Sequence, residues 1–146
     1  MYCTVNTVQY VYKAYCLILL IFVDSKCLFG YRLLLQHGAI VDEDTPAQFA
    51  DCPTPISTAA ALGREAVLRL LLDKTPSSIN VIMPDTFWTP LMFSAAAGSK
   101  PVAQLLLDRG ADPDRLNALN DTALDIAYQC EQPEIKAFLE VVMKFY

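Results

Sequence analysis

The residues best able to bind a metal ion or attack a substrate are few and widely spaced. The chain has one histidine, His37, and five cysteines, which are Cys3, Cys16, Cys27, Cys52 and Cys130. A structural zinc site needs close ligand pairs such as C-x-x-C, and the sequence contains no such pair. We therefore expect no metal ion and no other cofactor. We also expect the cysteines to be reduced and mostly buried, as is usual in a reducing compartment.

The motifs of common enzymes are also missing. A nucleophilic site built on His37 would need a nucleophile and an orienting acid nearby, and the sequence nominates neither. No Walker loop, G-x-G-x-x-G, H-E-x-x-H or G-x-S-x-G occurs. His37 directly precedes Gly38, and a cationic side chain at the C-terminus of a helix would interact favourably with its dipole. The sequence therefore predicts no catalytic residue and no enzymatic activity.

Charge and composition limit the class of partner. The 146 residues carry a formal net charge of -5 and contain no Lys/Arg run, while the acidic run at 42–44 reads as a solvated loop. Sequence-independent nucleic-acid binding needs a basic face that neutralises phosphates, so we expect no DNA or RNA partner. A basic patch on another protein suits this charge better. Apolar residues make up 54% of the chain, enough to bury the core of one domain.

An uninterrupted apolar run, AYCLILLIFV, occupies residues 14–23. As a helix it would rise about 15 Å, half of a hydrocarbon core about 30 Å thick, so it is a poor membrane span. Its length suits a signal peptide, but only one late positive charge precedes it and no small-x-small cleavage site follows. Membrane anchoring and secretion are therefore disfavoured. We expect an intracellular protein, cytoplasmic or nuclear.

Internal repetition is the strongest structural signal in the chain. Residues 54–63 read TPISTAAALG and residues 89–98 read TPLMFSAAAG, and a third copy starts TALDIA at Thr122. The three copies start 35 and then 33 residues apart. Each is followed by apolar residues at helical spacing. These residues are Val67, Leu70, Leu71 and Leu72, then Val102, Leu105, Leu106 and Leu107, then Ile135, Phe138 and Leu139.

Each copy reads as two helices joined by a tight turn. Threonine at the N-cap satisfies free backbone N–H groups, and proline fits the first helical position because its missing N–H costs nothing there. Alanines let the two helices approach closely, and Gly63 and Gly98 allow the turn between them. Gly110 ends the second helix of its copy before an extended loop. The leucine triplets give each second helix one broad apolar face.

This pattern resembles the ankyrin repeat, which has a period of about 33 residues and a T-P-L-H-x-A signature. The resemblance implies an all-α solenoid of stacked helix-turn-helix units with short hairpin loops, about four helix pairs in all. In the family, the signature histidine ties neighbouring hairpin loops together. Ser57, Met92 and Asp125 replace it here, so we expect loops that are held less firmly.

The alignment also suggests repeat boundaries. Aligning Leu33 with Leu70 places the apolar run where the first helix of a repeat should lie, which makes it part of a degenerate first repeat. We expect its helix to pack against the second repeat through Leu17, Leu19, Leu20 and Phe22. The predicted repeats are 14–45, 51–85, 86–118 and 119–146, with residues 1–13 unplaced.

The last predicted repeat, 119–146, has the features of a cap. Lys136 and Glu140 replace Ala103 and Leu107 on a face that is apolar in the preceding repeat. Charges there suit a terminal unit that faces water, as solenoids require.

The turn before each helix pair holds further candidates. Phe87 stands where the family usually has glycine, which predicts an irregular turn, and Asn120 at the same place tolerates left-handed geometry. Trp88 is either an interface anchor or a side chain folded onto its own hairpin beside Phe87. Met92 and Phe93 follow at helical spacing and are expected in the core.

The resemblance implies a protein-binding module or scaffold that holds another protein on its concave face. That face would be made of loop tips and inner helices. An alternative stays open, in which the chain is a regulatory segment of a larger enzyme or membrane-associated protein. By the resemblance, the contact positions are Asp51, Pro53, Leu62, Asp85, Thr86, Trp88, Leu119, Asp121 and Gln129.

Overall fold

The computed structural model describes residues 54–74, 76–83 and 86–145. These residues form six α-helices and one 3₁₀ helix, and none of them is in a β-strand. The predicted degenerate repeat, its packing residues and the unplaced segment 1–13 lie outside the described residues. The helices are α3 (Pro55–Ala61), α4 (Glu65–Lys74), η2 (Pro76–Asn80), α5 (Pro90–Ala97), α6 (Lys100–Asp108), α7 (Ala123–Gln129) and α8 (Pro133–Phe145).

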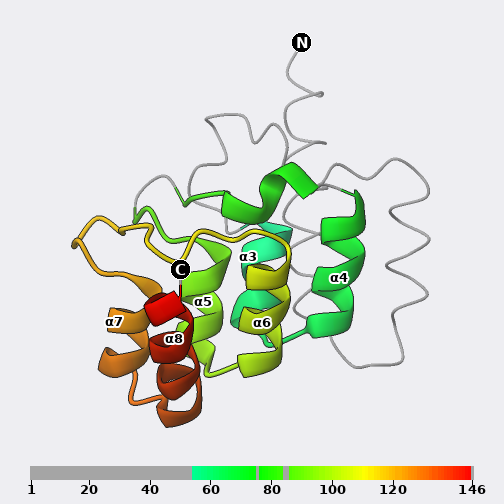
Figure 1. Cartoon of the computed structure of the whole chain (residues 1–146). Helices are drawn as coiled ribbons and strands as arrows, with labels where there is room; N and C mark the ends of the chain where they lie inside the picture. Colours follow the sequence, from blue (N-terminus) through cyan, green and yellow to red (C-terminus); the bar gives the residue numbers. More distant parts are fainter. Residues whose placement is uncertain (1–53, 75, 84–85, 146) are drawn as a thin grey trace.

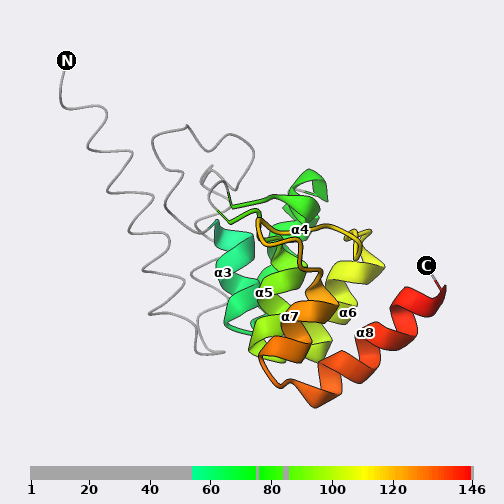
Figure 2. The same ribbon diagram turned by 90° about the vertical axis from the view of Figure 1, so that its left-hand side faces the viewer.

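The α-helices form pairs that stack in two layers. Helices α3, α5 and α7 lie side by side in the inner layer, and α4, α6 and α8 lie behind them in the outer layer (Figure 2). A short turn joins the two helices of each pair at one end of the stack, and longer connections between pairs run across the other end (Figure 1). The predicted all-helical stack is thus confirmed.

Threonine starts each inner helix as the sequence predicts. The side chains of Thr54, Thr89 and Thr122 accept hydrogen bonds from the backbone N–H groups three residues further on. Each threonine has extended backbone angles, and proline follows in the first turn of α3 and α5. These caps fix where the inner helices begin and therefore where the preceding loops end.

The turn inside the middle pair needs glycine for two reasons. Gly98 caps α5 with a φ of 71°, in the left-handed region that glycine adopts at little cost. A β-carbon there would overlap Oε1 of Gln132. Gln132 reaches across from the next pair and donates from Nε2 to the carbonyl of Ala96 at 3.3 Å. A side chain at residue 98 would therefore force the amide of Gln132 to move.

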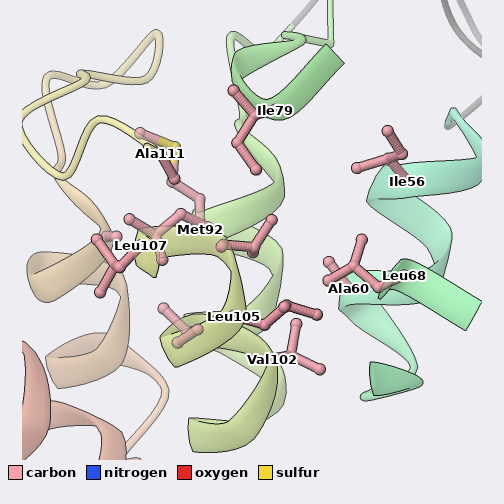
Figure 3. Close-up of a cluster of buried hydrophobic side chains, with 14 of the residues drawn as sticks. Ile56, Ala60, Leu68, Ile79, Met92, Val102, Leu105, Leu107 and Ala111 are labelled. Atoms are coloured by element: carbon pink, nitrogen blue, oxygen red, sulfur yellow. The ribbon is translucent and has the colours of Figure 1, made fainter. Parts of the chain in front are cut away.

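One continuous apolar core runs between the layers. Leu71, Leu106 and Leu139 occupy the same position of α4, α6 and α8, and each is 0% exposed. Met92 is buried in this core and Phe93 packs partly buried against it, as predicted. Ile79 and Ala111, from the connections that precede α5 and α7, extend the core beyond the helices (Figure 3).

Cys130 corrects one expectation. It is a free thiol at the C-cap of α7 and is exposed, so it is an exception to the expectation that the cysteines are mostly buried. The turn between α7 and α8 carries it to the surface, just as the equivalent residue Leu62 is 38% exposed after α3. The other four cysteines lie outside the described residues.

Candidate protein-binding face

The two long connections lie next to each other at one end of the stack. One runs from η2 to Thr89, and the other runs from Gly110 to Thr122 (Figure 1). The N–H of Ala118 donates to the carbonyl of Thr86 at 3.0 Å. The N–H of Asp112 donates to Oδ1 of Asn80 at 2.9 Å. These two hydrogen bonds join the hairpin turns of consecutive pairs.

Asn117 organises the second hairpin. Its side-chain Oδ1 accepts from the N–H of Leu119 at 2.8 Å and from the N–H of Asp121 at 2.9 Å. Its own N–H donates to the carbonyl of Asp121 at 3.0 Å, and its carbonyl accepts from the N–H of Asn120. The side chain is buried, with 6% of the residue exposed. Sequence reasoning missed this residue, although an asparagine two residues before a polar turn is a known signal for such bonding.

The first hairpin is one residue longer. The N–H of Phe87 donates to the carbonyl of Met83, four residues back, whereas the N–H of Asn120 donates to Asn117, three residues back. Phe87 has a φ of 54° and Asn120 a φ of 62°. The irregular turn predicted at Phe87 is therefore confirmed, and a bulky aromatic residue holds a conformation that such residues rarely adopt.

The three residues that replace the signature histidine bond within their own repeats. Sδ of Met92 accepts from the N–H of Thr89 at 3.4 Å. Oδ2 of Asp125 accepts from both the N–H and the hydroxyl of Thr122, each at 2.8 Å. Oγ of Ser57 accepts from the hydroxyl of its own N-cap threonine at 2.9 Å. Each therefore reinforces a helix cap, and the looser hold on the hairpins stays a prediction.

Trp88 uses part of its surface inside the fold. Its ring centroid lies 5.0 Å from that of Phe93, with the two planes tilted by 56°. This spacing is typical of a favourable aromatic pair, and Trp88 also packs against the core. The ring of Trp88 thus packs on Phe93 of the helix that follows it, and its role as an interface anchor stays a prediction. The residue nevertheless remains partly exposed.

The structure gathers some of the predicted contact residues and separates others. Asp51, Pro53 and Asp85 lie outside the described residues. Thr86, Trp88, Leu119 and Asp121 meet at the hairpins, where Thr86 and Leu119 are exposed and the other two are half-buried. Leu62 and Gln129 lie at the opposite ends of the inner helices, beside the short turns, so they share no local cluster with the hairpin residues.

Most of the exposed large apolar side chains of the described residues belong to two parts of the chain. The first lies on the hairpins and consists of Phe87 at 47% exposure, Leu116 at 51% and Leu119 at 78%. The second lies on the last helix pair and consists of Tyr128, Val141 and Phe145. Of these six residues, only Leu119 is among the contact positions predicted from the sequence.

Acidic side chains accompany the first cluster. Asp112 pairs with Arg115 at 3.8 Å. The carboxylates of Asp114 and Asp121 form no ion pair or hydrogen bond with any residue that the structure describes. We call Thr86, Phe87, Leu116, Leu119 and the carboxylates of Asp114 and Asp121 the hairpin surface. It combines exposed apolar area with negative charge.

Two other kinds of site are not found in the described part of the chain. No three His, Cys, Asp or Glu side chains there converge as metal ligands. No described helix has both the length and the apolar character needed to cross a membrane.

Comparison with known proteins identifies the repeated unit. A family model described as "Ankyrin repeats (3 copies)" matches residues 29–117 and 59–140. The chain is also similar to "Ankyrin repeat and SAM domain-containing protein 6" of Danio rerio, with 34% identity over 128 residues. That match covers 75% of this chain and 17% of the relative, so the chain spans less than a fifth of the relative's length.

Proposed function

This chain belongs to the ankyrin-repeat family, and from that premise we propose that it binds another protein on its concave face, through the hairpin surface, without catalysis of its own. Ankyrin repeats are protein-interaction modules. The single observation that carries the proposal is the juxtaposition of two hairpins, joined by the bond from Ala118 to Thr86, that both expose apolar side chains.

The hairpin surface exposes apolar side chains to water, which is unfavourable in free energy. Phe87 is 47% exposed, and its backbone is held in the left-handed region. Leu119 is 78% exposed on the neighbouring hairpin. Neither strain nor exposure of this kind stabilises the isolated fold. Contiguous exposed apolar area rimmed by polar residues is typical of a protein-interaction site.

Charge defines the chemistry of the partner. Neither Asp114 nor Asp121, both on the second hairpin, forms an ion pair with a described residue, and the chain carries a net charge of -5. A partner that presents an apolar side chain flanked by lysine or arginine would bury the first against Leu119 and pair the second with a carboxylate. Such complementarity mainly sets specificity and association rate.

A capture experiment tests the proposal. The full chain would be used as bait, beside a Leu119→Ser/Asp121→Lys variant and a Glu134→Lys control, and bound proteins would be identified by mass spectrometry. Glu134 is exposed at the start of α8, at the other end of the stack, and makes the same charge change. We expect a partner that the double variant loses and the control keeps, with melting temperatures close to that of the wild type. Equal capture by all three baits would contradict the role of the hairpin surface.

A second candidate is that the chain acts as the interaction segment of a longer protein, which the 17% coverage of its relative favours. The relative's name joins ankyrin repeats to a SAM domain. An antibody against residues 86–145, used on the source organism, would test this. A band well above 16.2 kDa supports the segment, and a band at that mass excludes it.

A further inference from the structure

Trp88 and Asp121 hold the same position in the two consecutive hairpins. Each directly precedes the threonine that caps the following inner helix. The carbonyl of Trp88 accepts from the N–H of Met83 at 3.0 Å, and the carbonyl of Asp121 accepts from the N–H of Asn117 at the same distance. Because α5 and α7 pack against each other, the two positions lie side by side at about the spacing of packed helices, roughly 8–10 Å.

The aromatic ring at the first of these positions is suited to a cation. The rings of Trp88 and Phe93 are tilted by 56°, so they form a corner rather than a closed stack, and both residues are half-buried. The face of an aromatic ring attracts cations, and tryptophan does so best. This chain already uses such a contact, since Nζ of Lys136 lies 4.0 Å from the centroid of the Tyr128 ring. Among the described residues, no lysine or arginine lies over Trp88 in this way.

The carboxylate at the second position has no cation from the described residues. Asp121 is half-buried, and only its backbone groups are bonded, to Asn117. Arg115 is the only basic residue in the connection that ends at Asp121, and it pairs with Asp112 at 3.8 Å. Residues 75–88, which lead to the first hairpin and form it, include no basic residue. A carboxylate that is partly withdrawn from water without a partner is stabilised by a cation that another molecule brings.

An arginine side chain fits this combination. A guanidinium group is planar, so its face stacks on an aromatic ring while the N–H groups along its edge donate to a carboxylate. A cation about 6 Å from a ring centroid and about 4 Å from a carboxylate oxygen spans a separation similar to that between the two positions. The ammonium group of lysine is a point charge without such a face. We propose that the Trp88 ring and the Asp121 carboxylate form a binding site for an arginine side chain of the partner, which we call the arginine site.

This inference rests on the proposed function and narrows the chemistry of the partner. Phe87 precedes Trp88 directly, and Leu119 precedes Asp121 by two residues, so exposed apolar side chains lie next to both halves of the site. An arginine bound there brings its neighbours in the partner onto these apolar side chains. The partner segment is therefore expected to carry an arginine close to an apolar residue.

The fluorescence of Trp88 tests the site directly, because this residue is the only tryptophan in the chain. The full chain would be titrated with N-acetyl-arginine amide and, separately, with N-acetyl-citrulline amide, which carries a neutral urea group in place of the guanidinium. We expect a saturable change with the arginine amide and a clearly weaker response to the citrulline amide. Asp121→Asn should weaken binding of the arginine amide by about threefold, because it removes one ion pair. The matched control is Asp114→Asn, which makes the same charge change on the same hairpin and should bind like the wild type.

Each contrary result has a definite meaning. Equal responses of the wild type to the two amides would overturn the proposal, and this comparison needs no variant. Equal weakening by Asp121→Asn and Asp114→Asn would also overturn it, because the overall charge of the surface would then account for the binding. A partner captured through Leu119 by a chain whose Trp88 does not respond to the arginine amide would exclude the arginine site and leave the proposed function intact. Binding of the arginine amide by a chain that captures no partner would support the site and contradict the proposed function.

Discussion

Ala118 and Thr86 are joined by a backbone hydrogen bond of 3.0 Å, from the N–H of one hairpin to the carbonyl of the other. Phe87 and Leu119 directly follow the two bonded residues in the sequence, and their apolar side chains are exposed to solvent on adjacent hairpins. The hairpin surface therefore depends on the stacking of two helix pairs, because neither hairpin alone presents both side chains.

Leu119 and Trp88 should separate binding from stability. Leu119→Ala removes a side chain that is 78% exposed, so the free energy of unfolding should change by less than about 0.5 kcal/mol. Affinity for a captured partner should fall, by more than about tenfold if Leu119 is an anchor. Trp88→Ala should lower the melting temperature as well, because the ring packs on Phe93 and the core. Calorimetry gives the stability of each variant, and a binding titration gives its affinity for the partner. A Leu119→Ala protein with wild-type affinity would exclude Leu119 from the interface.

Asn117 should be the most sensitive residue of the hairpins. Asn117→Ala leaves the N–H groups of Leu119 and Asp121 without the acceptor they now share, and partly buried donors without a partner cost about 1–3 kcal/mol. Asn120→Gly is the matched control, since a φ of 62° suits glycine and the change should cost little. Urea melts of both variants give the comparison. Equal stability of the two variants would show that the side chain of Asn117 is dispensable.

Truncation of Leu106 and of Lys136 should affect stability very differently. Leu106 is 0% exposed, so Leu106→Ala should lower the free energy of unfolding by about 2–5 kcal/mol through the cavity it leaves. Lys136→Ala should cost at most about 1 kcal/mol, the worth of an exposed cation–π contact. The measurement is urea denaturation of both variants. A loss from Lys136→Ala as large as that from Leu106→Ala would mean that the side chain of Lys136 contributes to the core.

Gly98 and Gly110 allow a test of the close approach between turns. Both have positive φ, at 71° and 92°, so alanine at either position should cost about 1–2 kcal/mol of backbone strain. A β-carbon at Gly98 would also displace Gln132, whereas one at Gly110 would meet nothing within 4 Å. We expect Gly98→Ala to be the more destabilising. In a Gln132→Ala background the difference between the two glycines should shrink, and an unchanged difference would place the cost elsewhere.

Tyr128 should titrate late. The hydroxyl of Tyr128 donates a hydrogen bond to Oε1 of Glu140, and this bond raises the pKa of Tyr128 above its ordinary value of 10.0. The contribution of the bond to stability is therefore fully present below pH 10 and is lost as pH rises through the raised pKa. The ultraviolet titration curve of the wild type minus that of Tyr128→Phe isolates this one phenol. We expect Glu140→Gln to lower the pKa of Tyr128, since it removes the charged acceptor. An identical curve with and without the Glu140 carboxylate would contradict the contact.

The sequence predicts those parts of the fold that depend on near neighbours in the chain. The N-caps Thr54, Thr89 and Thr122 bond to residues three positions away, so their Thr-Pro and Thr-Ala patterns were enough to place the inner helices. The irregular turn at Phe87 was predicted from the family resemblance, in which glycine usually stands at that position, and it too is a matter of local backbone conformation. Local chemistry of this kind needs no knowledge of the stack.

Contacts between repeats were harder to predict. Tyr128 meets Glu140 twelve positions away, and Gln132 meets Ala96 thirty-six positions away, and neither pair leaves a pattern in the sequence. The exposure of Cys130 was missed because burial depends on which side of a turn faces the next pair. Of the candidate site, sequence reasoning supplied Thr86, Leu119 and Asp121, while the roles of Phe87, Leu116 and Asn117 needed the arrangement of two hairpins.

The position of each helix pair in the stack has a consequence for the order in which the pairs unfold. Helix α5 packs between α3 and α7, whereas α7 and α8 have a described neighbour on one side only. In such an array each helix pair is stabilised only by the pairs that it contacts. Unfolding therefore starts at a pair with a neighbour on one side only and proceeds inward. Amide hydrogens of α8 should therefore exchange with deuterium earlier than those of α5, and a pulling force on the C-terminus should release α7–α8 before the rest.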